Sequence, residues 1–182
     1  MSRKKISFIV MSAAFTSLLL VLLPVTGVVK LFKIPSSSMS PTVQSGDTIF
    51  ATKVFNPANT VKRGDVVAYD GRLAALKDRH EMYLSRVVAT GGDTVEVVNG
   101  DLCVNGVALP ERNGLRCREV LKDRRFLQPV YPLKVPADSV FVIGDKYDNS
   151  LDSRYLGTIP LRAITHSAKR IMGPAGHAGK IE

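Results

Sequence analysis

The chain has 182 residues, of which 45% are hydrophobic and 23% are charged. This is the composition of an ordinary globular protein and excludes a disordered or fibrous chain. The formal net charge of +9 raises nucleic acid as a partner. However, the Lys and Arg residues alternate with acids and lack aromatic neighbours, so we expect no nucleic-acid partner. A surface that faces anionic lipid headgroups explains the excess charge equally well.

The N-terminal region contains a long apolar run. Residues 6–29 carry no charge, and at about 1.5 Å per residue a helix of this length spans the roughly 30 Å hydrocarbon core of a bilayer. A cleavable signal peptide is the alternative, since Arg3, Lys4 and Lys5 precede the run. The run exceeds the usual h-region, and no clear small-x-small cleavage site follows. We predict a cytoplasmic basic segment (residues 1–5), a transmembrane anchor (residues 6–29) and an extracytoplasmic body.

The body has the pattern of an all-β domain with a mainly antiparallel sheet. Asn99-Gly100 and Asn105-Gly106 each supply the residue pair that a type I′ turn needs, so residues 94–109 are expected to form a tight meander. The predicted strands are short runs rich in β-branched and aromatic residues, at 48–54, 65–69, 83–89, 93–98, 140–143 and 164–171.

Three other segments carry weaker signals. Residues 110–136 hold four prolines and several charges without periodicity, which indicates a long surface excursion. Residues 173–182 form a flexible tail after a β domain that we assign to residues 30–172. Cys103 and Cys117 are the two cysteines. Outside the cytoplasm a disulfide between them would contribute about 3 kcal/mol through loop closure, and two unrelated thiols are the alternative.

Two segments carry chemistry-bearing residues. Residues 34–42 read Ile-Pro-Ser-Ser-Ser-Met-Ser-Pro-Thr, which composition alone would assign to a linker. Residues 144–157 read Gly-Asp-Lys-Tyr-Asp-Asn-Ser-Leu-Asp-Ser-Arg-Tyr-Leu-Gly and directly follow an apolar strand. Such a density of acids and hydroxyls predicts a hydrogen-bonded site at a strand end. A calcium loop using Asp148, Asn149 and Asp152 is the physical alternative, although the spacing does not follow an EF-hand.

Together with residues 63–67 (Arg-Gly-Asp-Val-Val) and 83–93 (Tyr-Leu-Ser-Arg-Val-Val-Ala-Thr-Gly-Gly-Asp), these segments resemble the type I signal peptidase family over nearly the whole chain. The resemblance implies a signal-peptidase-like, mainly antiparallel β domain behind one N-terminal transmembrane helix. It implies a serine endopeptidase of the Ser-Lys type. No metal or organic cofactor is implied.

The resemblance assigns roles residue by residue. Ser38, before Met39, matches the nucleophile, and Ser36 matches the hydroxyl that helps to stabilise the oxyanion. Ser150 matches the hydroxyl that positions the general base. Two ion pairs match supporting positions: Asp152 with Arg154, and Arg86 with Asp145.

The departure from the family lies at Ser85. The bacterial family has a lysine immediately before this arginine, and the endoplasmic reticulum branch has a histidine. A second hydroxyl cannot accept the proton of Ser38. Lys146, Lys77 and His80 are the candidates for a replacement base, and a lysine would need burial to lower its pKa while a histidine would not.

These features predict a membrane-bound serine endopeptidase that removes signal peptides from exported preproteins at the outer face of the bacterial cytoplasmic membrane. A dedicated peptidase for pilin precursors of a conjugation system is one form of this function. The alternative is a non-catalytic homologue that binds exported peptides without cutting them. Expected partners are signal peptides or pilin precursors and membrane lipid.

Overall fold

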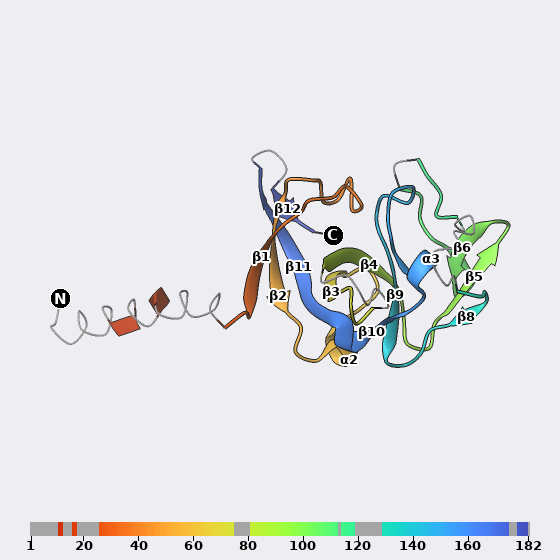
Figure 1. The fold of residues 1–182 in the computed structure, drawn as a ribbon, viewed down its shortest axis with the longest axis horizontal. Coiled ribbons are helices and arrows are strands. Elements are labelled where there is room, and N and C mark those ends of the chain that lie inside the picture. Colours follow the sequence, from red (N-terminus) through yellow and green to blue (C-terminus); the bar gives the residue numbers. More distant parts are fainter. Residues whose placement is uncertain are drawn as a thin grey trace.

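The structure is a computed structural model, and it describes residues 11–12, 16–17, 26–74, 81–112, 114–118, 129–174 and 178–181. Within these residues the fold is mainly β (Figure 1). Every strand pair is antiparallel. The fold class predicted for the body is therefore confirmed. The described helices are short: α2 (Pro57–Thr60), α3 (Ser153–Leu156) and the 3-10 turn η1 (Leu161–Ala163).

The larger of two sheets has the described strand order β1-β2-β11-β3-β4-β9-β10, with β12 paired to β11. In Figure 1 it curls around the centre of the molecule. Its strands are β1 (Val29–Lys33), β2 (Thr48–Lys53), β3 (Val66–Asp70), β4 (Met82–Thr90), β9 (Ser139–Ile143), β10 (Ile159–Pro160), β11 (Ile164–Gly173) and β12 (Gly179–Lys180).

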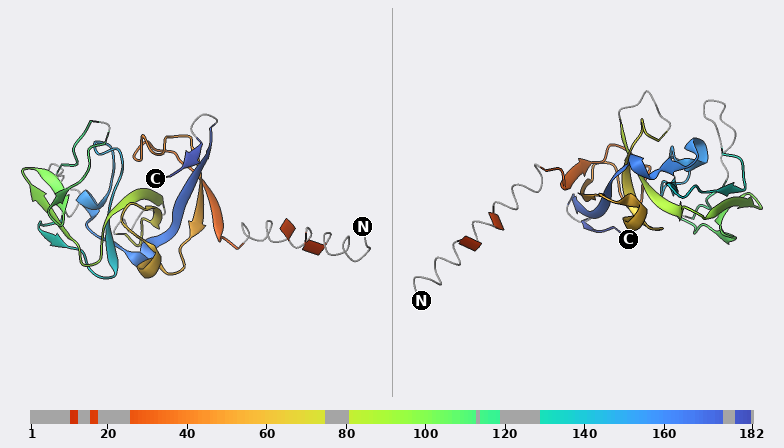
Figure 2. Two further views of the ribbon diagram at one scale, coloured as in Figure 1. Left: turned by 180° about the vertical axis from the view of Figure 1, so that it is seen from behind. Right: turned by 90° about the horizontal axis from the view of Figure 1, so that it is seen from below.

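The smaller sheet has the order β7-β6-β5-β8 and lies beside the larger one in all three views (Figures 1 and 2). The predicted meander is present, with positive φ at both central residues of each turn: 53° and 84° at Asn99-Gly100, and 51° and 79° at Asn105-Gly106. Its strands are β5 (Thr94–Val98), β6 (Asp101–Val104), β7 (Val107–Ala108) and β8 (Leu133–Lys134).

Strand β9 contributes to two apolar clusters, one on each of its faces. All five of its residues are buried. Val140 and Val142 join the cluster that contains Tyr69 and Val87. The alternate residues Phe141 and Ile143 join the cluster beneath the smaller sheet. A strand that is covered on both faces reads as a continuous apolar run, as this one does.

Several expectations need correction. Both cysteines are free and buried. Cys117 packs with Leu102 and Val104 of the core, whereas Cys103 lies between those two on β6 and so points to the opposite face. The excursion at 110–136 is not all surface, because Cys117 and Val135 are each 1% exposed. The tail also contributes structure, since Gly179 pairs with Ile171 of β11.

Most of the predicted anchor lies outside the described residues. Lys77 and His80 also lie outside them. In the part of the chain that the structure covers, no helix has the length and apolar character needed to cross a bilayer. Val29, the last residue of the predicted anchor, begins β1 and pairs with Thr52 of β2.

Candidate active site

The loop after β1 presents two serine hydroxyls. Met39 and Val43 are buried in an apolar cluster with Ile34, and they anchor the loop to the sheet. Ser36 and Ser38 remain accessible on its outer side. Their Oγ atoms lie 3.2 Å apart, within hydrogen-bond distance. The loop thus brings together the two hydroxyls that the sequence singled out.

The loop after β9 packs directly on this serine loop. The backbone N–H of Lys146 donates to the carbonyl oxygen of Ser38 at 3.0 Å. The Asn149 side-chain amide donates to Ser37 Oγ at 3.1 Å. Gly144 is needed because an added Cβ would come 2.7 Å from the Ser38 carbonyl oxygen and 2.6 Å from Ser150 Cβ. Ser150 therefore lies beside the backbone of the serine loop.

A buried ion pair fixes the base of the second loop. Asp152 is 0% exposed, and its two carboxylate oxygens accept from Arg154 Nε and Nη2, each at 2.9 Å. The same carboxylate accepts from the backbone N–H groups of Gly144 and Arg154. Burial opposes the charge of Arg154, but the hydrogen bonds and charge of Asp152 together outweigh it and raise the pKa of Arg154.

The alternative of a calcium loop does not fit this arrangement. Asp152 already satisfies both of its oxygens with Arg154 and the backbone, and the Asn149 amide is turned toward Ser37 as a donor. Across the described part of the chain, no group of three or more His, Cys, Asp or Glu side chains is placed to hold a metal ion.

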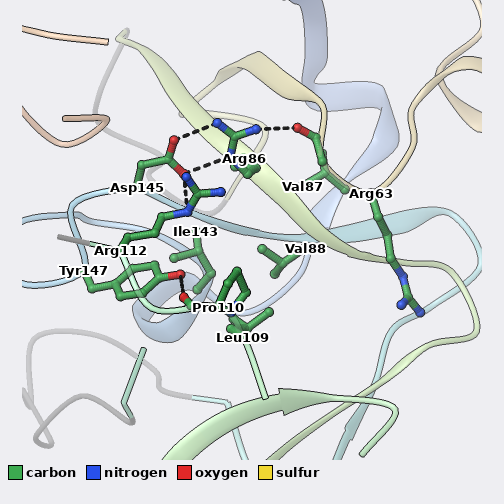
Figure 3. A pocket seen from close by; sticks show the side chains of 11 residues that line it. Arg63, Arg86, Val87, Val88, Leu109, Pro110, Arg112, Ile143, Asp145 and Tyr147 are labelled. Atoms are coloured by element: carbon green, nitrogen blue, oxygen red, sulfur yellow. Dashed lines mark hydrogen bonds and ion pairs between the residues drawn. The ribbon is translucent and has the colours of Figure 1, made fainter. Parts of the chain in front are cut away.

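The second ion pair links β4 to the same loop. Arg86 Nε and Nη2 donate to the two oxygens of Asp145 at 2.9 and 2.7 Å. Figure 3 shows this fork, with Arg112 approaching the same carboxylate from the other side at 3.3 Å. Thr42 of the serine loop also donates to Asp145, at 2.5 Å. The sequence did not assign roles to Thr42 or Arg112, because their partners are distant along the chain.

Ser85 contacts a buried tyrosine of the neighbouring strand. It is 2% exposed and faces Val67 across the β3–β4 ladder. Its Oγ lies 3.4 Å from the hydroxyl of Tyr69, whose ring stacks on Tyr83. Burial, the largest cause, raises the pKa of Tyr69, so this phenol stays protonated at neutral pH and cannot act as a base. Tyr69 is a site residue that the sequence analysis missed, and β-strand alternation alone gives no signal for its contact with Ser85.

Of the candidate replacement bases, only Lys146 lies in the described part of the chain. Its backbone is bonded to Ser38, and its side chain is half-buried. The backbone of Lys146 is thus next to the nucleophile. It is placed there by the loop after β9, whereas the lysine of the family would come from β4.

A groove of about 350 Å³ leads to the serine loop. One wall is residues 32–35, at the end of edge strand β1, and the other is residues 81–84, at the start of β4. Within the described residues, this first half of β4 pairs only with β3, because the pairing with β9 begins at Arg86. Two open strand edges thus face the groove, an arrangement suited to an extended peptide.

Comparison with known proteins identifies the family of the chain. The family model described as signal peptidase, peptidase S26, matches residues 7–172. The chain therefore belongs to the signal peptidase family. A signal peptidase I from Leptolyngbya laminosa is 32% identical over 157 residues, covering 81% of this chain and 70% of the relative. Signal peptidase I P from Bacillus subtilis subsp. natto is 32% identical over 147 residues, covering 78% and 75%.

Among solved structures, a signal peptidase I from Enterococcus faecalis V583 is 26% identical and covers 58% of this chain and 94% of its own. The TM-score of this match is 0.41. The resemblance to signal peptidases noted in the sequence is confirmed by the family match and the relatives.

Proposed function

We propose that the protein is a serine endopeptidase that removes signal peptides from exported preproteins. The observation that carries the proposal is the Ser36–Ser38 hydroxyl pair, 3.2 Å apart, at the end of a groove with two open strand edges. Relatives at 32% identity that are named signal peptidase I support the substrate class.

The groove suits a peptide that adds as a strand. The free backbone edges of β1 and of the first half of β4 would bond an extended chain, and side-chain pockets would select its residues. Ile34, Ile49 and Leu84 contribute apolar surface to the groove. A cavity of about 350 Å³ admits small side chains from the segment before the cut bond, in keeping with the small residues that the family resemblance implies.

The chemistry proposed is acyl transfer through Ser38. Its Oγ attacks the scissile carbonyl carbon, the hydroxyl proton passes to a base, and the peptide nitrogen leaves as an amine once it is protonated. Water then attacks the acyl-enzyme and releases the signal peptide with a carboxylate. Ser36 Oγ and the backbone N–H of Ser38 are assigned to the oxyanion, and one such donor is worth about 2.7 to 4 kcal/mol in a serine peptidase.

The proton acceptor is the open part of the mechanism. We assign it to Lys146, because its backbone bond to Ser38 and its half-buried side chain are the contacts that favour it. Ser85 and Tyr69 are excluded as bases by their hydroxyl chemistry and by the raised pKa of Tyr69. Asp152 with Arg154, and Arg86 with Asp145, support the loops without reaching the reacting atoms.

A second function is favoured by one observation. Ser85 and Tyr69 fill the buried space on β4 where the family resemblance expects a lysine. A protein with this substitution and no working Lys146 would keep the groove and bind exported peptides without cutting them.

The proposed location follows from residues 1–29. The anchor precedes β1, which begins at Val29, the basic residues 1–5 stay cytoplasmic and the β domain faces the periplasm or exterior of a bacterium. The substrates there are exported preproteins, including pilin precursors of a conjugation system, presented at the lipid surface. Mass spectrometry of protein from the membrane fraction should show an intact N-terminus. A mature N-terminus after Gly27 would overturn the anchor.

The test is cleavage of a signal-peptide substrate with alanine at the first and third positions before the bond. The full chain in detergent should cut it, and Ser38→Ala should abolish cutting. Ser45→Ala removes another serine of the same loop and should cut normally. Cleavage that survives Ser38→Ala would refute the assignment of the nucleophile. Peptide binding without cleavage by the wild-type chain would establish the second function.

A further inference from the structure

A second cavity, of about 210 Å³, is lined by residues of β4 and β9, by the loop after β9 and by the segment after β7. Figure 3 shows its two halves. One half is polar, with the guanidinium groups of Arg86 and Arg112 at the carboxylate of Asp145. The other half is apolar and is formed by Val88, Leu109, Pro110 and Ile143, with the ring of Tyr147 beside them.

The cavity carries excess positive charge. Arg86 and Arg112 contribute two cations against the single anion of Asp145. Arg63, which also lines the cavity, is already paired with Asp93. The Arg86 side chain is 7% exposed, so this charge is built into the fold, whereas the Arg112 side chain is 27% exposed and can reach a ligand. The partly accessible Arg112 guanidinium carries the positive charge that Asp145 does not balance, and it lies next to apolar walls. Such a site favours an anion on a short aliphatic stem.

The cavity also continues the path of the groove. Along β4, the groove wall at residues 81–84 is followed by Ser85 and then by the cavity wall at Arg86 and Val88. Along the serine loop, the groove wall at residues 32–35 is followed by Ser36 and Ser38 and then by Thr42, which bonds to Asp145 at the cavity. On the serine loop the order is therefore groove, nucleophile, cavity, and on β4 it is groove, Ser85, cavity.

We propose that this cavity is a subsite for an acidic side chain of the substrate, carried on the segment that follows the bond attacked by Ser38. The proposal rests on the peptidase function above. Arg112 bonds the carboxylate, Leu109 and Ile143 contact its aliphatic stem, and the buried Arg86–Asp145 pair holds Arg112 in position. A glutamate side chain has the length and chemistry that this cavity accepts.

The test measures binding, so that it does not depend on turnover. Fluorescein-labelled peptides carry the alanine-containing segment before the bond and four residues after it, with Glu or Gln placed at each of these four positions in turn. They are titrated by fluorescence anisotropy onto the full-length Ser38→Ala chain in non-ionic detergent. At one position, Glu should bind about tenfold tighter than Gln, the effect of one charge-assisted hydrogen bond. Salt should weaken this preference.

Two arginine variants locate the effect. Arg112→Gln should remove the preference for Glu while leaving the Gln peptide unchanged. Arg72→Gln changes an arginine that likewise pairs with an aspartate, Asp70, and lies outside the cavity, so this variant should keep the preference. Equal binding of Glu and Gln at all four positions overturns the subsite and leaves the proposed function standing. A preference that persists in Arg112→Gln overturns the assignment to this cavity, and failure of every peptide to bind overturns both proposals.

Discussion

Ser85 occupies the position on β4 where the family resemblance expects the general base. Its hydroxyl is buried on β4 against Tyr69, and the Tyr69 ring is stacked on Tyr83 with centroids 5.8 Å apart. A lysine side chain needs more length and volume than this serine. The tyrosine hydroxyl lies 3.4 Å from Ser85 Oγ, so a longer side chain that extends from position 85 in this direction would meet it.

Restoring the lysine therefore requires two changes. We expect Ser85→Lys alone to be poorly accommodated, because overfilling a packed core costs about 1 to 3 kcal/mol. Adding Tyr69→Phe removes the obstructing hydroxyl. If no group serves as the base in the wild-type chain, the double variant should cut a signal-peptide substrate about 10² to 10⁴ times faster than the wild type, the usual contribution of a general base. Single-turnover assays of the wild type, both single variants and the double variant measure this.

The competing outcome involves Lys146. If Lys146 is the base, as we propose, Lys146→Ala should lose activity while Lys146→Arg fails to restore it, because an arginine stays protonated. Rescue of Lys146→Ala by the double variant at 69 and 85 would show that both positions deliver a base to Ser38. A fully active Lys146→Ala would remove Lys146 from the mechanism.

The buried ion pair of Asp152 and Arg154 contributes to the stability of the folded chain. Replacing Asp152 with Ala leaves a buried guanidinium and two backbone N–H groups without their acceptor, so we expect a loss of about 3 to 5 kcal/mol in the free energy of unfolding. Urea unfolding followed by circular dichroism measures it. The exposed pair of Asp70 and Arg72 is the matched control, and Asp70→Ala should shift the midpoint little.

The loop after β9 acts as an element that holds the serine loop in place. Gly144→Ala should reduce cleavage and peptide binding together, because its Cβ would meet the carbonyl of Ser38 and the side chain of Ser150. Gly179→Ala on β12 meets nothing within 4 Å and should behave like the wild type. Peptide titration and thermal unfolding of the two variants separate the effects. Normal binding by Gly144→Ala would show that the loops move apart without cost.

The elements themselves were largely predictable from the sequence. Strand alternation and the two Asn-Gly pairs located β2 to β6, because local side-chain patterns and φ preferences determine them. The short strands β8, β10 and β12 were missed, since two residues carry too little pattern.

The site was predictable only in part, because its other contacts depend on how the strands pair and on where the two sheets lie. The motifs located Ser36, Ser38 and the Asp152–Arg154 pair. The contact of Ser85 with Tyr69 depends on the β3–β4 register, and the contact of Arg112 with Asp145 depends on where the smaller sheet lies. The prediction of a disulfide failed for the same reason, because the spacing of Cys103 and Cys117 along the chain does not tell which face of β6 each thiol occupies.

At the scale of the whole molecule, Asp93 joins the two sheets where β4 leads into β5. Its carboxylate accepts from Arg63 Nε at 2.8 Å, from the Thr90 N–H at 2.7 Å and from Asn105 of the meander at 3.1 Å. Its backbone carbonyl accepts from the N–H of Val135, the residue after β8, at 2.8 Å. One side chain therefore ties the larger sheet, the meander and the strand after it.

This junction should make stability depend on acid. The hydrogen bond from Arg63, followed by those from Thr90 and Asn105, outweighs desolvation and holds the pKa of Asp93 well below its ordinary value. In the unfolded chain the carboxyl titrates near about 3.9. Ionised Asp93 thus stabilises the folded state above that pH, and the contribution is lost as the pH falls through the range below it, where the unfolded chain binds a proton that the folded chain does not.

Asp93→Asn tests this dependence, because the amide keeps the shape of the side chain and loses its charge. The variant should be less stable than the wild type at pH 7. The difference in urea midpoint should shrink between pH 4 and pH 2.5, because the wild type then loses the contribution of the ionised carboxylate, which the variant lacks at every pH. Partial exposure of Arg63 makes the difference smaller in high salt. A difference that stays constant from pH 7 to pH 2.5 would mean that hydrogen bonding by the side chain, and not its charge, holds the two sheets together.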